Sequence, residues 1–289
     1  MDVFTPRSLP EALEIRGAHP EAVPVAGGTD LMVQVNFDRI RPRALLDLSR
    51  VEELRGWGRD NGVVQVGAGM TFTRIARELQ EFGSLAEASR AVGSPQIRNR
   101  ATIGGNLATA SPAGDSIPVL AAYGAVVVVA GPGGRTRRIP WDEFLIGPKR
   151  TTLAPDELIV RVEWRPVAGP GSFAKVGPRN AMVIAVAGVC LQLDEAGRNV
   201  RLALGSVGPT VLRAPRAESF AATALAERGA WDDPDAAVPA SVASEFGHLA
   251  GAEAHPIDDV RGSAAYRRHV VEVLAGRALG WALEDRRAA

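Results

Sequence analysis

The chain has 289 residues, with 33 basic and 33 acidic side chains that leave no formal net charge. This length suits two domains, and a hydrophobic content of 46% is enough for buried cores. A neutral chain lacks the basic excess by which proteins bind nucleic acid or membrane surfaces. The single cysteine, Cys190, excludes an intramolecular disulfide, a zinc–thiolate site and an iron–sulfur cluster held by this chain alone.

Neither the N-terminus of the chain nor its apolar runs suggest a signal peptide or a membrane span. Residues 1–6 lack the basic start and the apolar run of a signal peptide. The longest apolar runs, 126–130 and 181–193, are too short or too interrupted to span a bilayer. The sequence therefore predicts a cytoplasmic chain without a membrane span.

The first 164 residues alternate helical and strand patterns. Ser8 and Glu11 have the spacing of a capping box and predict a short helix, and Thr29 or Asp30 could cap a second helix through residue 36. Glycines at 131–134 predict a hairpin turn. Strand patterns occupy 23–26, 44–48, 63–66, 125–130, 135–139 and 158–164, and further helical patterns occupy 71–79, 85–92 and 117–122.

The order of the predicted elements changes after a Pro- and Gly-rich linker at 165–171. Strands are predicted at 173–176, 182–193 and 200–206, with a turn at 195–197, and helices follow at 221–228, 238–250 and 264–283. Strands followed by helices indicate the α+β class. We expect one domain at 1–168, with subdomains of about 1–55 and 56–168, and a C-terminal α+β domain at 172–289.

A first glycine-rich feature, residues 67–72, follows a strand and precedes a helix, as a dinucleotide-binding loop would. It lacks the third glycine of that fingerprint, and no acidic residue ends a second strand at the required distance. A plain strand-to-helix turn is the better interpretation.

Two other turns carry paired glycines beside hydrogen-bonding side chains: Gly27-Gly28 beside Thr29 and Asp30, and Gly104-Gly105 beside Thr102 and Asn106. Backbone N–H groups of such turns can close around an anion because no Cβ stands in the way. Two turns of this kind could hold a diphosphate without a lysine or arginine. Tight turns without a ligand remain the alternative, and the residues alone do not choose among cofactors.

At these residues the sequence resembles the FAD-binding medium subunits of the molybdenum hydroxylases, the family of carbon monoxide dehydrogenase and xanthine dehydrogenase. Further motifs carry the resemblance along nearly the whole chain. They are Gln96-Ile97-Arg98-Asn99-Arg100-Ala101, Ser111-Pro112-Ala113-Gly114-Asp115-Ser116, Pro155-Asp156-Glu157-Leu158-Ile159 and Phe173-Ala174-Lys175.

The resemblance implies a two-subdomain FAD-binding unit of the PCMH type, followed by a C-terminal domain with a small antiparallel sheet and helices. By the same resemblance, the first turn would wrap the FAD diphosphate and the second would close its other side. The residues implied in these two turns are Pro24, Val25, Ala26, Gly27, Gly28, Thr29, Asp30 and Leu31, then Thr102, Ile103, Gly104, Gly105 and Asn106.

Three more residues are implied beyond the turns. Asp115 would accept a hydrogen bond from the cofactor, Ile159 would pack on it, and Lys175 would lie near the polar edge of the flavin. Each has a simpler interpretation: a helix cap for Asp115, a core residue for Ile159 and a surface lysine for Lys175.

Two positions depart from the xanthine-oxidising relatives. Val92 stands where they have an aromatic residue near the flavin, and Pro148 stands where they have a tyrosine. A valine cannot stack on a flavin, so these departures place NAD in doubt as the electron acceptor.

The function implied is that of an electron-transfer subunit, which takes electrons from a [2Fe–2S] partner and passes them to an external acceptor. This chain has no cysteine set for such a cluster. The resemblance implies that the [2Fe–2S] clusters and the molybdenum cofactor belong to a small and a large partner subunit, assembled with this chain as a dimer of heterotrimers. Two alternatives are a free-standing FAD oxidase or reductase, which would need its own acid or base near the flavin, and a scaffold without enzymatic activity.

Overall fold

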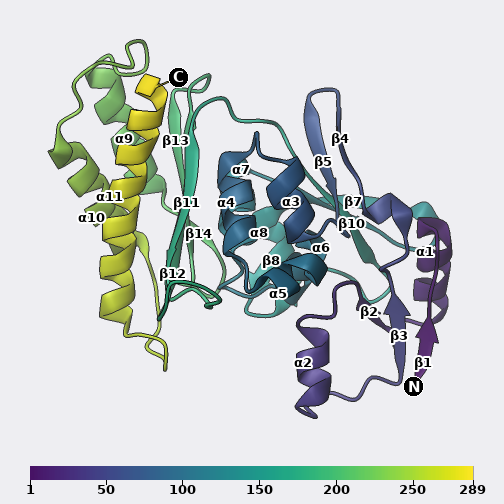
Figure 1. Ribbon diagram of the computed structural model, residues 1–289. Helices are drawn as coiled ribbons and strands as arrows, with labels where there is room; N and C mark the ends of the chain where they lie inside the picture. The colour runs from purple at the N-terminus through teal and green to yellow at the C-terminus, as the bar shows by residue number, and fades with distance from the viewer. Residues whose placement is uncertain (289) are drawn as a thin grey trace. The chain divides into compact units, whose positions relative to one another are not determined.

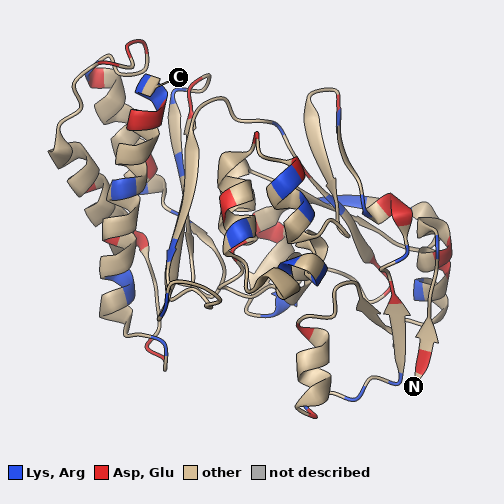
Figure 2. Ribbon diagram, viewed as in Figure 1, with Lys and Arg blue, Asp and Glu red and all other residues tan. Residues whose placement is uncertain are grey.

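The computed structural model describes residues 1–288, and their contacts form two compact units. Unit 1 comprises Met1–Ile75, Ser94–Ser111 and Gly124–Arg165, and unit 2 comprises Ala76–Gly93, Pro112–Tyr123 and the chain from Pro166 onward. Figure 1 shows the elements of both units, and Figure 2 shows that both signs of charge are interspersed along each of them. The domain boundary predicted at 168–172 stays a prediction.

Unit 1 contains two sheets. The smaller sheet has the order β1-β3-β2 with parallel pairs, and the larger one has the order β4-β5-β10-β6-β7 with antiparallel pairs. Their strands are β1 Asp2–Phe4, β2 Val23–Val25, β3 Ala44–Asp47, β4 Trp57–Asp60, β5 Val63–Gly67, β6 Val126–Ala130, β7 Thr136–Pro140 and β10 Leu158–Trp164. The hairpin β8 Leu145–Gly147 and β9 Arg150–Thr151 stands apart from both sheets.

Short helices connect these strands. They are α1 Leu9–Ala18, α2 Leu31–Asn36, α3 Phe72–Glu78 (which runs into unit 2), α5 Pro95–Arg100, α6 Ile103–Thr109 and α8 Trp141–Phe144. The predicted cap of α1 is confirmed, because the Ser8 hydroxyl accepts a hydrogen bond from the Glu11 N–H at 3.3 Å. Ala12 and Leu13 of α1 pack with Leu46 of β3 in a buried cluster, which joins the small sheet to its helix.

Unit 2 is built on the antiparallel sheet β11-β12-β13-β14. Its strands are β11 Gly171–Val176, β12 Ala187–Asp194, β13 Asn199–Gly205 and β14 Leu212–Arg213, and its helices are α4 Gly83–Ala91, α7 Ser116–Tyr123, α9 Pro215–Glu227, α10 Ala240–Glu253 and α11 Ala264–Ala288. Helices α9 and α11 contact one side of the sheet and α4 and α7 the other, as Figure 1 shows.

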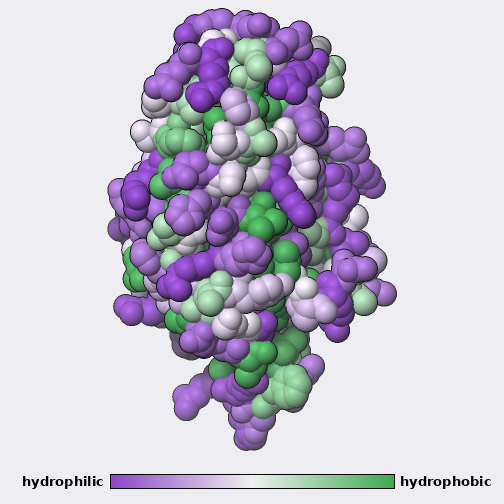
Figure 3. All heavy atoms as spheres, turned by 90° about the vertical axis from the view of Figure 1, so that its left-hand side faces the viewer, coloured by the Kyte–Doolittle hydropathy of each residue, from purple (hydrophilic) through white to green (hydrophobic). Residues whose placement is uncertain are grey.

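The core of unit 2 explains this layering. Strand β12 is buried on both faces, as its near-continuous apolar sequence requires, and Val189, Leu191 and Leu193 join α9–α11 in one apolar cluster. Seen from outside in Figure 3, the α9–α11 side carries mostly hydrophilic side chains with smaller apolar areas between them. The α+β class is confirmed.

The structure contains short elements that the sequence did not predict, among them β1, β4, β8, β9, β14 and α8, and it corrects the prediction at two further places. The strand expected from residue 182 begins only at Ala187, because Met182 adopts a left-handed conformation (φ 52°) that no strand accommodates. The glycine-rich stretch 93–115, for which no element was expected, contains α5 and α6. Ser94 and Thr102 cap these helices with their hydroxyls, a signal that the paired glycines obscured.

Among residues 1–288, no helix is both long and apolar enough to cross a membrane. In the same residues, no group of three or more His, Cys, Asp or Glu side chains is arranged to hold a metal ion.

Candidate functional site

The first glycine turn joins β2 to α2 in unit 1. Gly28 has φ +74°, a conformation that favours glycine, and an ideal Cβ on Gly27 would lie 2.1 Å from the Arg100 carbonyl oxygen. Gly28 therefore requires glycine for its backbone conformation, and Gly27 requires it for close packing against the chain at Arg100-Ala101.

The first turn leaves its donors unused. Among the residues that the structure describes, the N–H groups of Gly27, Gly28, Thr29 and Asp30 donate to no other group. The three residues before Asp30 are half-buried. Successive backbone N–H groups that no protein group accepts can bind an anion where they converge.

Asp30 lies at the predicted N-cap position of α2, but the predicted capping hydrogen bond is absent. Its side chain instead accepts a hydrogen bond from Gln34 Nε2 at 2.6 Å. Thr29 lies one residue too early to cap this helix. The N–H groups at the start of the turn are thus left without a side-chain acceptor.

The second glycine turn uses its donors within the fold. Ile103 N–H donates to the Met70 carbonyl at 3.1 Å, Gly104 N–H to the Ala68 carbonyl at 2.9 Å, and Gly105 N–H to the Thr102 hydroxyl at 3.0 Å. The Asn106 N–H bonds to the Thr102 carbonyl at 3.0 Å. Of these residues, Gly105 is exposed and Gly104 is buried.

The glycine-rich segment 67–72 supports this second turn. An ideal Cβ on Gly104 would lie 2.5 Å from the Ala68 Cβ and 2.8 Å from the Ala68 oxygen, so the two segments pack backbone to backbone. On its other side, Gly67 packs against the Leu54 carbonyl, 2.3 Å from an ideal Cβ. The segment is a strand-to-helix turn, as predicted, and its glycines serve close packing.

The structure brings the two turns together. Gly27 packs on Arg100-Ala101, the two residues immediately before Thr102. Ile159 lies in β10, buried and paired with Val129, and α6 packs against this strand. Unit 1 therefore gathers both turns and the strand of Ile159, while Asp115 and Lys175 belong to unit 2.

Asp115 and Lys175 form a buried ion pair in unit 2. The ammonium Nζ of Lys175 lies 2.6 Å from Asp115 Oδ2, and both side chains are at most one-tenth exposed. Burial raises the pKa of the Asp115 carboxyl to about 6, and the neighbouring Lys175 opposes that rise. Lys175 is therefore not a surface lysine, and the carboxylate of Asp115 bonds to it.

Lys175 also donates to two backbone carbonyls, that of Ala91 at 2.9 Å and that of Val183 at 3.3 Å. Sequence reasoning missed both contacts, as it missed the support of the second turn by Ala68. A carbonyl partner carries no side-chain signature, so no motif could have revealed them.

Two family models match the chain. Residues 1–164 match the FAD binding domain in molybdopterin dehydrogenase, and residues 172–282 match the CO dehydrogenase flavoprotein C-terminal domain.

Curated relatives match over most of their length. The carbon monoxide dehydrogenase medium chain of Hydrogenophaga pseudoflava is 31% identical over 97% of both chains. The nicotinate dehydrogenase FAD-subunit of Eubacterium barkeri is 34% identical over 68% of this chain and 70% of its own. Among solved structures, quinoline 2-oxidoreductase from Pseudomonas putida 86 superposes with a TM-score of 0.87 at 26% identity, covering 99% of this chain and 98% of that one.

Proposed function

This chain belongs to the FAD-binding subunits of the molybdenum hydroxylase family, and we propose that it carries electrons within such a complex. It takes them from a [2Fe–2S] subunit and passes them to an external acceptor. Substrate oxidation takes place in another chain, which holds the molybdenum cofactor. The family match covers both parts of the chain, and the relatives that support it are themselves subunits.

One observation carries the assignment of the cofactor site: the run of N–H groups at Gly27–Asp30 that donate to no other described residue. A diphosphate supplies oxygen acceptors of the matching charge, and backbone donors need no basic side chain to hold it. Such a site fits the local sequence, since the segment 17–38 between Arg16 and Arg39 contains no lysine or arginine.

The other proposed contacts follow from what each residue leaves available. Gly105 exposes its backbone on the outer side of the second turn, and Asp115 keeps Oδ1 free of any partner in the described chain. The run of N–H groups at Gly27–Asp30 is flanked in sequence by residues 24–26 and Leu31. The second turn is held in place from inside the fold by Thr102, Ile103 and Gly104. Ile159 lies in β10, the strand against which α6 packs.

Bound FAD supplies the electron chemistry, because a flavin accepts and releases electrons one or two at a time. The chain's own residues bind and orient it. The N–H groups of the first turn would donate hydrogen bonds to the diphosphate, and the buried Asp115 would accept one from an N–H or O–H of the cofactor. Electrons that arrive singly require no proton abstraction from a substrate, and the protons that the reduced flavin takes up would come from solvent.

The assignment is tested by two alanine variants with the same backbone cost. Gly28 (φ +74°) and Gly133 (φ +72°, with open space around it) both adopt the left-handed conformation that penalises alanine by about 1–2 kcal/mol. We expect Gly28→Ala to weaken FAD binding at least about tenfold, because it would distort the run of N–H groups at Gly27–Asp30. We expect Gly133→Ala to leave the FAD affinity unchanged. Flavin absorbance after purification and FAD titration measure both.

Equal FAD affinity in the two variants would contradict the proposed site. A protein that binds no FAD in any form would contradict the function itself. Reduction of the bound flavin by a small organic substrate, without any partner, would favour the free-standing oxidase instead.

We further propose that the complex is a dimer of heterotrimers in the cytoplasm, with one small [2Fe–2S] and one large molybdenum subunit per copy of this chain. Co-expression of the three chains followed by light scattering measures the mass. A mass that matches one copy of each chain, or this chain alone, would exclude this assembly.

A further inference from the structure

The backbone that packs against the first glycine turn belongs to the end of α5. An ideal Cβ on Gly27 would lie 2.1 Å from the Arg100 carbonyl oxygen, 2.6 Å from the Arg100 carbonyl carbon and 3.0 Å from the Ala101 nitrogen. All three are backbone atoms, so no side-chain rotation can relieve this contact. The peptide between Arg100 and Ala101 therefore limits where Gly27 can lie.

This peptide stands at the point where the helix ends. Ala101 has an extended backbone (φ −62°, ψ 133°), and its N–H donates to the Ile97 carbonyl at 2.7 Å. Arg100 is exposed and Ala101 is half-buried, so burial of their side chains does little to fix the peptide. Hydrogen bonds to neighbouring segments have to hold it instead.

The start of α3 supplies these hydrogen bonds. Phe72 N–H donates to the Ala101 carbonyl at 3.1 Å, and the Thr73 hydroxyl donates to Asn99 Oδ1 at 2.7 Å. Two consecutive residues of α3 thus hold the residues on either side of Arg100, one through the backbone and the other through a side chain. All of these residues belong to unit 1.

Helix α5 needs this support because it is short. It has six residues, and isolated helices shorter than about 12 residues are marginal in water. The Ser94 hydroxyl accepts the Ile97 N–H at 3.3 Å and caps the start of the helix. The end of the helix, at Asn99 and Arg100, depends on its contacts with α3 and with the first turn.

The two bonds from α3 differ in what a substitution can remove. The Phe72 bond is made by the backbone of a residue that is 1% exposed, so no side-chain change deletes it without disturbing the core. The Thr73–Asn99 bond joins two side chains, of which Thr73 is half-buried and Asn99 is exposed. It can therefore be removed while the core stays intact.

We propose that Thr73 and Asn99 are positioning residues of the cofactor site. Their hydrogen bond fixes the Arg100–Ala101 peptide, and this peptide holds the first turn in the conformation that leaves the N–H groups of Gly27–Asp30 available to a diphosphate. The proposal rests on the proposed function, because it concerns how that site is held. Neither side chain has to touch the cofactor.

FAD titration of variants at the two positions tests this. Thr73→Val keeps the shape of the side chain and removes the hydroxyl, and we expect it to weaken FAD binding about fivefold, the size of one neutral hydrogen bond. Asn99→Ala should weaken FAD binding to a similar extent. The double variant should be no worse than the stronger single one, because both changes remove the same bond. Thr73→Ser, which keeps the hydroxyl, should retain most of the affinity.

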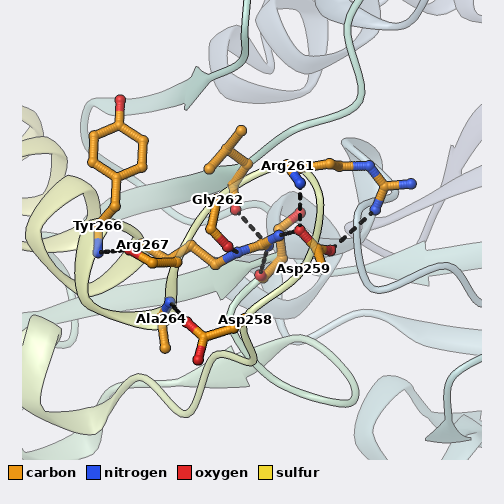
Figure 4. Close-up of polar contacts among 10 residues, drawn as sticks. Asp258, Asp259, Arg261, Gly262, Ala264, Tyr266 and Arg267 are labelled. Carbon is orange, nitrogen blue, oxygen red and sulfur yellow. Dashed lines mark hydrogen bonds and ion pairs between the residues drawn. The ribbon is translucent and has the colours of Figure 1, made fainter.

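A hydrogen bond in unit 2 provides the control for a general loss of stability. Asp258 Oδ1 accepts the Ala264 N–H at 2.6 Å where α11 begins, as Figure 4 shows. Asp258→Ala removes this exposed bond and should lower the urea midpoint about as much as Thr73→Val does. It should leave the FAD affinity unchanged, whereas a purely structural role of Thr73 predicts the same affinity loss in both variants.

Amide hydrogen exchange of the FAD-free protein follows the segment directly. We expect the Phe72 N–H to exchange about fivefold faster in Thr73→Val, because the neighbouring hydrogen bond to Asn99 is lost. Unchanged exchange would show that this bond does not hold segment 99–101.

Faster exchange with unchanged FAD affinity would refute the positioning role and leave the proposed function standing. Losses that multiply in the double variant would also overturn the proposal, because they would indicate separate contacts of the two side chains. A wild-type protein that binds no FAD would instead contradict the proposed function, and this proposal with it.

Discussion

The two glycine turns of unit 1 look alike in sequence and differ in hydrogen bonding. The first, at Gly27-Gly28, has N–H groups that donate to no described residue, whereas the second, at Gly104-Gly105, directs its N–H groups to Ala68, Met70 and Thr102. A glycine pair therefore does not by itself indicate an anion site. In the second turn, Gly104 is needed because two backbones touch, and in the first the glycines leave donors available.

The largest effect expected from this comparison is at Gly104. A valine there would place its Cβ against Ala68, so we expect Gly104→Val to destabilise the protein by about 3 kcal/mol or to prevent folding. Urea unfolding of the FAD-free protein measures this. Gly105→Val, whose Cβ would meet only the Thr102 hydroxyl at 3.0 Å, is the control and should fold. Wild-type stability in Gly104→Val would refute the packing role.

Gly105→Val then serves as a separate probe of the second turn. Gly105 is exposed, so a valine side chain there would not disturb the fold, and it would intrude on a cofactor bound against this turn as proposed. We expect a folded protein that has lost most of its FAD, seen as a loss of flavin absorbance. Full retention of FAD would show that the second turn only supports the first and does not touch the cofactor.

A smaller effect concerns the pH dependence of stability in unit 2. The pKa of Asp115 is raised to about 6 in the folded protein from an ordinary value of 3.8, so between these values the folded state binds more protons than the unfolded state. This group's contribution to stability therefore falls as pH rises from about 4 to about 6. Melting temperatures of FAD-free protein should show this slope, and Asp115→Asn should remove it. An equal slope in that variant would assign it to other groups.

The smallest effect is expected at Thr102. Its hydroxyl caps α6 through Gly105 N–H, so Thr102→Val should cost about 1 kcal/mol in urea unfolding and release one N–H group. FAD affinity should change little if the second turn contributes packing alone. A large loss of FAD with little loss of stability would instead give the second turn a binding role like that of the first.

Much of the fold could be predicted because its signals are local. The cap at Ser8, the hairpin at 131–134 and the apolar strands β6, β10 and β12 follow from turn chemistry and periodicity. Helices α5 and α6 were missed because their glycines and polar residues resemble a loop, although Ser94 and Thr102 are ordinary caps. The strand expected at 182–186 failed because Met182 is left-handed (φ 52°) and because the carbonyls of Met182 and Val183 bond to Arg179 and Lys175 instead of to a neighbouring strand.

The sequence by itself determined the class, the family and the two glycine turns, since these depend on residue types at short spacing. Only the tertiary structure decided which turn has N–H groups without an acceptor in the protein, because the acceptors of the second turn are the distant carbonyls of Ala68 and Met70. It likewise decided that Lys175 is buried against Asp115 and Val183. Backbone acceptors are the same at every residue, so their use in a site can be recognised only when the chain is folded.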